Sequence, residues 1–277
     1  MNKYFLILLI FTGLISCDKK EEVSNSIVSY PMNIGTEWIY ERQSVSNYYK
    51  YDSSKTAINA ENITGTLIKS DTIKSILRKW IEKDTVINDK KLSVFKTIDT
   101  LNNAILTEYK FFDSEGLKTY ACSDKYIFSP SSINNNKLNV SLLNINVERK
   151  NNSFINGDIF FEETPALDIK YPLSVNSSWS YSYLIFNVYK FPTNHLTVVK
   201  NVIGIEDLIL IGNKFNCFKI EFRNSNLSDD YYYDKDINWI SKDGLIKSYH
   251  VSKSLEFNSN FYTEHINLLT LKKITLK

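Results

Sequence analysis

The chain has 277 residues, of which 43% are hydrophobic, 14% aromatic and 23% charged. This composition is typical of a globular protein and excludes disordered and collagen-like chains. The formal net charge is +2, so the charge balance gives no indication of a nucleic acid or an acidic polymer as partner. Tyr and Phe are abundant while Gly and Pro are scarce, and this bias favours β-sheet.

The first sixteen residues resemble the signal peptide of a bacterial lipoprotein. Lys3 gives a positive start, and the twelve residues Tyr4–Ile15 are apolar, too short for a membrane-spanning helix of ~20 residues but suited to a signal peptide. The run ends in Leu14-Ile15-Ser16-Cys17, which resembles a lipobox, with Ile15 where a small residue is usual. The resemblance implies cleavage before Cys17 and acylation of its sulfur and its new amine. An ordinary secretory peptide with an incidental cysteine is the alternative.

Residues 17–29 are polar and have little to bury, so we expect a flexible tether behind the acylated Cys17. Two or three acyl chains hold a protein stably on a membrane, whereas one holds it only marginally. Lys20-Glu21-Glu22 resembles a signal that sends some Gram-negative lipoproteins to the cell surface. We therefore expect a lipid-anchored protein of the outer membrane, on its periplasmic face or on the cell surface.

An internal repeat organises the rest of the chain. Tyr30–Tyr40 and Tyr171–Tyr181 share the pattern of Tyr-Pro followed by Trp-x-Tyr, which we call the Tyr-Pro/Trp motif. Two further pairs of segments match in the same order: Asp84–Thr97 with Asp207–Ile220, at a constant offset of 123, and Phe111–Ala121 with Trp239–His250, with one gap. Three matches in order predict a duplicated unit.

Each unit is predicted to consist of antiparallel strands joined by short turns. The turns are expected at Asn88-Asp89 and Gly212-Asn213, and the hairpins at Ser114–Gly116 and Lys242–Gly244, where Gly allows a positive φ. Ser70–Lys83 is ambiguous. Its apolar spacing alone indicates an amphipathic helix, whereas its repeat counterpart Asn194–Glu206 is β-branched and alternating and favours a strand.

The predicted fold class is therefore mainly β, with two tandem, duplicated, curved antiparallel units behind the signal peptide. We place the first unit at residues 30–128 and the second at 165–277. Residues 129–164 form an Asn-rich connection, in which the phase of the alternation between Leu138 and Val147 flips and predicts one bulged strand. The last strand is expected within Asn258–Leu276.

The second unit resembles a domain family of uncharacterised secreted bacterial lipoproteins. The resemblance is carried by Pro172–Tyr181, by Gly212–Ile220 and by the hairpin Gly244–Lys247, with Asn176 where the family has Gly. It implies a strongly curved antiparallel sheet, akin to the half-barrels of lipoprotein carriers. Such a concave face would hold an acyl chain or another apolar ligand, which is an argument from fold alone.

Residues that carry catalytic chemistry give no recognisable pattern. His195, His250 and His265 have no partner at metal-ligand spacing. We interpret the adjacent carboxylates Glu162-Glu163 and Asp229-Asp230 as solvated loop charges, because neighbours on a strand face opposite ways. No metal, cofactor or enzymatic activity is expected.

The remaining cysteines, Cys122 and Cys217, are interpreted as buried thiols, with a disulfide as the alternative. Tyr48, Tyr49, Tyr51 and Tyr231–Tyr233 are either strand tyrosines or an exposed aromatic patch.

Three functional hypotheses remain open. The first is a non-enzymatic envelope lipoprotein that binds an apolar, lipid-like ligand or a neighbouring protein on its curved sheet. The second is a purely structural or accessory surface lipoprotein in an outer-membrane complex. The third is a hydrolase whose site is assembled in space from a histidine and two carboxylates.

Overall fold

The computed structural model describes residues 29–51, 59–101, 103–124, 159–186, 192–224, 232–256 and 260–277. In these ranges the chain forms twelve strands and no helix, which confirms the prediction of a mainly β protein. The strands are β1 (Glu37–Lys50), β2 (Thr66–Ile87), β3 (Lys90–Asp99), β4 (Ala104–Phe112), β5 (Gly116–Asp124), β6 (Ile159–Lys170), β7 (Ser178–Phe186), β8 (Pro192–Leu210), β9 (Asn213–Asn224), β10 (Tyr232–Ser241), β11 (Gly244–Leu255) and β12 (Phe261–Thr275).

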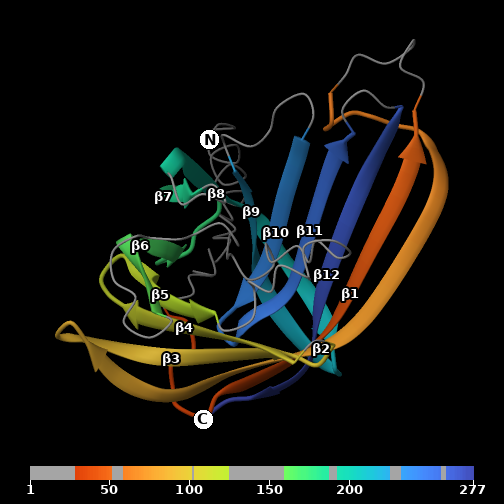
Figure 1. The fold of residues 1–277 in the computed structure, drawn as a ribbon. Coiled ribbons are helices and arrows are strands. Elements are labelled where there is room, and N and C mark those ends of the chain that lie inside the picture. Colours follow the sequence, from red (N-terminus) through yellow and green to blue (C-terminus); the bar gives the residue numbers. More distant parts are fainter. Residues whose placement is uncertain are drawn as a thin grey trace, which may run out of the picture.

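All twelve strands belong to one antiparallel sheet with the order β6-β5-β4-β3-β2-β1-β12-β11-β10-β9-β8-β7. It consists of two six-stranded meanders, β1–β6 and β7–β12, joined where β1 pairs with β12 from Glu37↔Thr275 to Lys50↔Phe261. Figure 1 shows the sheet curving until its edge strands β6 and β7 approach each other. The expected curved antiparallel sheets are present, and they share one continuous ladder.

The segments matched in the sequence occupy equivalent strands of the two meanders. Asp84–Thr97 lies in the β2–β3 hairpin and its match in the β8–β9 hairpin. Equivalent contacts recur at the offset of the repeat: Lys91 pairs with Asp84 at 3.5 Å and Lys214 with Asp207 at 2.9 Å. A common origin by duplication stays a prediction, as does the division of the chain into two units.

The ambiguous segment Ser70–Lys83 is part of strand β2, as the repeat favoured and the helical spacing did not. Strand β6 begins at Ile159, so its first residues belong to the stretch expected to connect the units. Glu162 and Glu163 consequently lie in a strand, and their interpretation as loop charges is wrong. The bulged strand expected between Leu138 and Val147 and the pair Asp229-Asp230 lie outside the described residues.

The two long hairpins turn where positive φ is tolerated. Asn88 and Asp89 have φ of 49° and 61°, as expected. In the second hairpin the positive angles fall on Ile211 (50°) and Gly212 (74°), one residue earlier than predicted. The offset of the repeat accounts for this shift, because it aligns Asn88-Asp89 with Ile211-Gly212 rather than with Gly212-Asn213.

In a meander the connections alternate between the two ends of the sheet. One end, which we call the base, therefore carries the chain before β1, the connections β2–β3, β4–β5, β6–β7, β8–β9 and β10–β11, and the C-terminus. The other end, the rim, carries the remaining six connections. Asn33 donates a hydrogen bond to the carbonyl of Lys277, which ties the two ends of the described chain together at the base (Figure 1).

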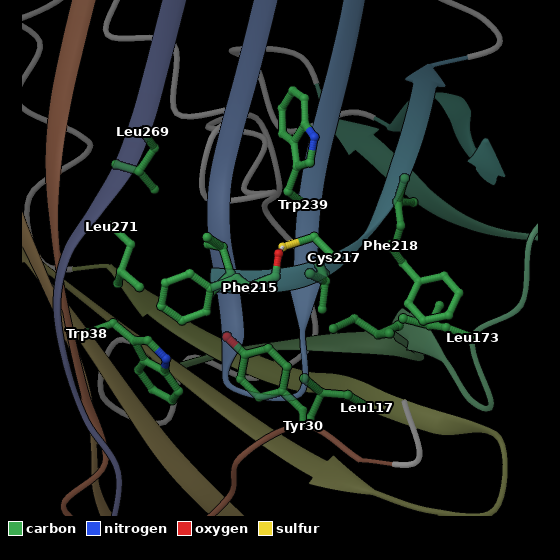
Figure 2. Packing of buried hydrophobic residues seen from close by; sticks show 14 of the residues in the cluster. Tyr30, Trp38, Leu117, Leu173, Phe215, Cys217, Phe218, Trp239, Leu269 and Leu271 are labelled. Atoms are coloured by element: carbon green, nitrogen blue, oxygen red, sulfur yellow. Dashed lines mark hydrogen bonds between the residues drawn. The ribbon is translucent and has the colours of Figure 1, made fainter. Parts of the chain in front are cut away.

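Apolar side chains fill the base. The cluster brings Trp38 of β1, in the first meander, together with Leu271 of β12 and with Phe215 and Cys217 of β9, in the second meander (Figure 2). Trp38 and Cys217 are fully buried. Because both meanders contribute to this cluster, the two halves share one hydrophobic core rather than each closing its own.

The first Tyr-Pro/Trp motif latches the two meanders together. Trp38 donates its indole hydrogen to the carbonyl of Asp243 at 2.8 Å, in the β10–β11 hairpin of the other meander. The second motif begins by extending the β5–β6 ladder by one residue, because the backbone nitrogen of Tyr171 donates to the carbonyl of Glu115 at 2.9 Å. A Cβ on Gly244 would lie 2.8 Å from Trp38 Nε1, so glycine lets the latch close.

Candidate functional site

The inward face of the wall above the base is charged and hydroxylated. Residues paired across an antiparallel ladder face the same way, so the register carries Arg42 of β1 over Ser75 of β2 and His250 of β11 beside Asp236 of β10. The buried polar residues at such positions are Arg42, Ser75, Thr97, Asp99, Glu108, Lys110, Thr119, Lys200, Asp234, Asp236, Ser248, His250, Ser252 and Asn267. This inner wall is the candidate functional site.

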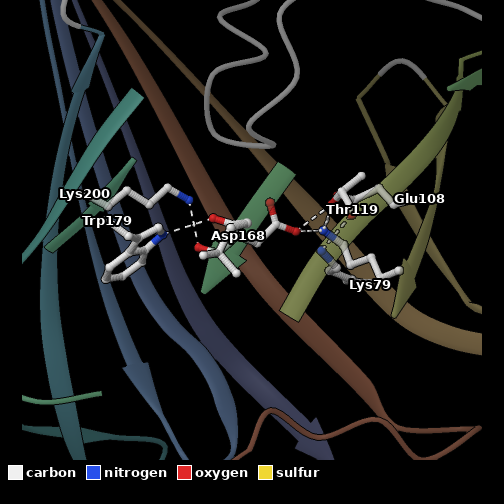
Figure 3. Close-up of polar contacts among 8 residues, drawn as sticks. Lys79, Glu108, Thr119, Asp168, Trp179 and Lys200 are labelled. Carbon is white, nitrogen blue, oxygen red and sulfur yellow. Dashed lines mark hydrogen bonds and ion pairs between the residues drawn. The ribbon is translucent and has the colours of Figure 1, made fainter. Parts of the chain in front are cut away.

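Lys110 is the centre of the first charge cluster. Its ammonium lies 2.8 Å from Glu108, 2.5 Å from Asp168 and 2.7 Å from the Thr119 hydroxyl, which it donates to. Lys79 approaches the other oxygen of Glu108 at 2.9 Å (Figure 3). The cluster therefore ties β2, β4, β5 and β6 together through side chains as well as through the ladder.

Burial and charge oppose each other in this cluster, and charge prevails. Burial alone would lower the pKa of Lys110, but Asp168 and Glu108 outweigh it and raise that pKa. Burial alone would raise the pKa of Glu108 and of Asp168, yet the neighbouring lysines hold both below their usual values. All three groups are therefore charged at neutral pH.

The same cluster bridges the seam between β6 and β7, the two edge strands of the sheet. Lys200 of β8 donates to the backbone carbonyl of Asp168 at 2.8 Å, and Trp179 of β7 donates to that of Leu167 at 3.0 Å (Figure 3). Both acceptors are carbonyls of β6. Two side-chain donors thus supply, across the seam, hydrogen bonds that a neighbouring strand would supply elsewhere in the sheet.

A second cluster is centred on His250, whose side chain is 0% exposed. Its Nδ1 lies 3.1 Å from Asp236, although neither ring nitrogen has the geometry of a hydrogen bond, so the contact is one of charge. Burial favours the neutral ring, but Asp236 and then Asp234 outweigh it and raise the pKa of His250. Burial also raises the pKa of Asp236, against the opposing effect of His250.

A third buried contact joins β1 to β3. Arg42 lies 2.7 Å from Asp99, and both side chains are 9% exposed. Burial lowers the pKa of Arg42 although Asp99 opposes that effect. The positive and negative groups of the inner wall thus compensate one another within the wall.

The candidates from the sequence are only partly brought together. His265 lies on β12, two positions from Asn267, the residue that pairs with His250. Its ring contacts the Ser46 hydroxyl of β1 at 3.0 Å, so it does not lie beside His250. The side chain of His195 and the anchor residue Cys17 lie outside the described residues. Among the residues that are described, no group of three His, Cys, Asp or Glu side chains could hold a metal ion.

Cys122 and Cys217 are buried reduced thiols, as the apolar strand pattern indicated. Burial raises the pKa of Cys217 to about 12, so the sulfur is a weak nucleophile at neutral pH. Of the tyrosines, Tyr49 stacks on Tyr262 at 4.7 Å and Tyr48 on Phe261 at 5.9 Å. These two therefore pack against β12, as strand tyrosines do.

Sequence reasoning missed the charged clusters, although one signal was available. Carboxylates or opposite charges two residues apart on a strand share a face, and Glu108-x-Lys110 and Asp234-x-Asp236 have this spacing. The partner Asp168 is 58 residues from Lys110, and no local pattern links them.

No helix in the described ranges is long and apolar enough to cross a membrane. No protein-family model matches the chain, and no curated protein does.

Comparison with solved structures finds similar chains among bacterial exported proteins. A candidate lipoprotein from Parabacteroides distasonis ATCC 8503 is 13% identical, with a TM-score of 0.36 over 90% of this chain and 99% of that one. A candidate exported protein with a YmcC-like fold from Bacteroides fragilis NCTC 9343 is 10% identical, with a TM-score of 0.35 over the same shares. The hypothetical lipoprotein YmcC from Escherichia coli K12 is 11% identical, with a TM-score of 0.30 over 85% and 84%. At such identities and scores, neither family membership nor activity carries over to this chain.

Proposed function

We propose that the chain is a non-catalytic lipoprotein of the outer membrane, anchored through Cys17, which binds a partner through its curved sheet. The lipobox-like sequence before Cys17 supports the anchor. The observation that carries the non-catalytic part is the state of the inner wall. Its charges lie against one another, and His250, which lies beside Asp236, is fully buried.

A general acid or base must lie within hydrogen-bond reach of the proton that it moves. His250 at 0% exposure and Asp236 at 2% meet one another rather than a space that a substrate could enter. Ser248 and Ser252 flank His250 on the same strand face and are equally buried. The histidine and two carboxylates of our third hypothesis do come together here, but as an interior charge contact, and we favour a structural role for them.

Between the two kinds of partner expected from the sequence, the wall favours a protein. Hydroxyl and charged groups occupy the buried inward positions of β1, β4, β10 and β11. An acyl chain laid against them would leave those polar groups without water, which is costly. A neighbouring envelope protein, held at the outer surface or rim of the sheet, would leave the inner polar groups as they are and would not carry this desolvation cost.

The anchor is tested by expressing the full-length chain in a Gram-negative host as wild type and as Cys17→Ser. We expect the wild type to fractionate with the outer membrane and to carry the added mass of its acyl chains, and the variant to lose both. Cys122→Ser is the matched control, because that thiol is buried inside the sheet and should not affect fractionation. Unchanged fractionation and mass in Cys17→Ser would refute the anchor.

The binding mode is tested separately on the lipid-free mature chain. Native mass spectrometry of this chain should show no bound lipid. On intact cells, a photo-crosslinker placed in the full-length chain at Leu67, exposed at the rim end of β2, should join the chain to one neighbouring protein. A stoichiometric bound lipid would instead support the apolar-ligand hypothesis. A rim without any crosslinked neighbour would refute the protein partner.

A further inference from the structure

The base of the molecule carries exposed aliphatic side chains at positions that recur in the two meanders. In the two Tyr-Pro/Trp motifs these are Ile34, 52% exposed, and Val175, 43% exposed. In the two long hairpins they are Val86, 67% exposed, and Ile209, 78% exposed, which are related by the repeat offset of 123. Ile211 in the β8–β9 turn, 43% exposed, and Leu276 beside the C-terminus, 47% exposed, are further exposed aliphatic residues of the base.

The hairpins expose Val86 and Ile209 because they extend beyond their neighbours. Strand β1 pairs with β2 only as far as Trp80, so the last residues of β2 pair with β3 alone. Strand β7 pairs with β8 only as far as Asn201, and the rest of β8 pairs with β9 alone. Each hairpin therefore ends as a two-stranded ribbon that reaches out from the base (Figure 1).

The base is also the end from which the tether leaves. The described chain begins at Ser29 and runs directly into the first Tyr-Pro/Trp motif, which is tied to Lys277. Ser29 lies twelve positions after Cys17, and the chain between them spans at most ~40 Å when fully extended. An anchored Cys17 thus limits how far the base can lie from the lipid, and it sets no such limit on the rim.

Charge at the hairpin tips is balanced. Residues 84–91 contain two aspartates and two lysines, and residues 207–214 contain one of each. Lys91 and Lys214 contact Asp84 and Asp207 on the same ribbons. A surface that accepts these tips must therefore reward apolar contact rather than net charge, as the interface of a phospholipid bilayer does.

We propose that the base rests on the phospholipid surface that holds the acyl chains of Cys17, with Val86 and Ile209 inserted at its interface. This inference rests on the anchoring in the proposed function. The two ribbon tips and the tether then give three points of contact, which fix the orientation of the sheet and turn its rim away from the membrane.

The test uses the full-length lipidated protein in vesicles of phosphatidylethanolamine and phosphatidylglycerol. An environment-sensitive dye is attached to Val86→Cys, to Ile209→Cys or, as matched control, to Leu67→Cys. Leu67 is a comparably exposed aliphatic residue, at 50%, but lies at the rim end of β2, where it pairs with Tyr49 of β1. The native thiols Cys122 and Cys217 are buried and do not compete for the dye.

We expect a lipid-borne quencher near the head groups to quench the dyes at 86 and 209 at least about two-fold more strongly than the dye at 67, because insertion brings them to the interface. The quenching should be insensitive to salt and should persist in vesicles of phosphatidylcholine alone. Protein that fails to float with the vesicles would refute the anchor. Protein that floats but shows equal quenching at all three sites would overturn the orientation and leave the anchor intact.

A double variant that keeps its fold tests whether the tips themselves hold the base on the lipid. Val86→Asp with Ile209→Asp should retain the unfolding transition of the wild type, since both side chains are exposed. In the lipidated protein, a dye at Ile34→Cys should be quenched much less in this double variant than in a protein with the native tips, because the charged tips move the base away from the lipid. Unchanged quenching at residue 34 in this variant would contradict insertion of the tips.

Discussion

Removing the Lys110 ammonium should destabilise the fold more than any single exposed ion pair could. In Lys110→Met the side chain keeps its length, but Glu108 and Asp168 lose a partner at 2.8 Å and 2.5 Å. Both carboxylates contact the same nitrogen, so they lie within about 5 Å of each other and repel by roughly 3 kcal/mol at an effective dielectric constant of 20. Breaking a buried ion pair from one side typically costs about 3–5 kcal/mol, and we expect a loss in that range.

The pH dependence gives this prediction a distinctive sign. In the wild type the pKa values of Glu108 and Asp168 are lowered, so their contribution is present above the pKa of the unfolded chain and is lost on acidification through the folded values. In Lys110→Met, burial and mutual repulsion raise these pKa values instead. The variant should therefore become more stable, relative to the wild type, as the pH falls from neutral towards 5.

The assay is urea unfolding of the lipid-free mature chain, followed by tryptophan fluorescence at several pH values. Lys91→Met is the matched control, because Lys91 is 79% exposed and 3.5 Å from Asp84, and such a pair contributes only about 0–1 kcal/mol. Adding Glu108→Gln and Asp168→Asn to Lys110→Met should recover much of the loss, since no charge is then left unpaired. A Lys110→Met loss below about 1 kcal/mol without the acid effect would refute the charge argument.

Three further predictions concern backbone, titration and thiols. Gly116→Ala should cost more than about 2 kcal/mol in urea unfolding, because φ is 149° and a Cβ would lie 2.0 Å from a carbonyl oxygen, whereas Gly204→Ala, with nothing within 4 Å, should stay within about 0.5 kcal/mol. Because the pKa of His250 is raised, its contribution to stability is present below pH ~6.5 and is lost as the pH rises through the folded pKa. The free energy of unfolding should then fall by at most about 1.4 kcal/mol per pH unit. His250→Gln should flatten this dependence on pH, and an unchanged dependence would exclude His250 as its source. The thiol of Cys217, with its pKa raised to about 12, should react with a disulfide reagent only after unfolding, and rapid labelling of the folded chain would contradict its burial.

The sequence was most informative where two copies of a pattern could be compared. Ser70–Lys83 taken alone has helical spacing, but its counterpart Asn194–Glu206 does not, and the structure places both in long strands. Periodicity failed here because β2 is exposed along much of its length and, of its apolar residues, buries only Leu77 and Ile81. With few buried positions, the apolar residues of a strand need not alternate strictly.

What the sequence could not predict are the contacts between the meanders. The indole of Trp38 finds the carbonyl of Asp243, 205 residues away, and Lys200 finds that of Asp168 across the seam. Local patterns predict strands and turns, but the partner of a buried donor depends on which edges of the sheet meet. The buried charges of the inner wall could not be predicted for the same reason. In the sequence each resembles a solvent-exposed strand residue, and only the curvature of the sheet buries it.

The positions of the Trp38 latch, the seam and the tether together imply that the two ends of the sheet have different roles. The base is closed by the shared core and by the contact of Trp38 with Asp243, and it is the end from which the tether leaves. Within the wall, Arg42 compensates Asp99, Lys110 compensates Asp168, and His250 lies against Asp236. If the base lies on lipid, the protein surface that remains accessible to a neighbour of the envelope is the rim, whose connections vary in length from the short β3–β4 turn to the long stretch between β5 and β6. Loops carried on a rigid sheet are where binding residues concentrate, and the search for a partner should therefore begin there.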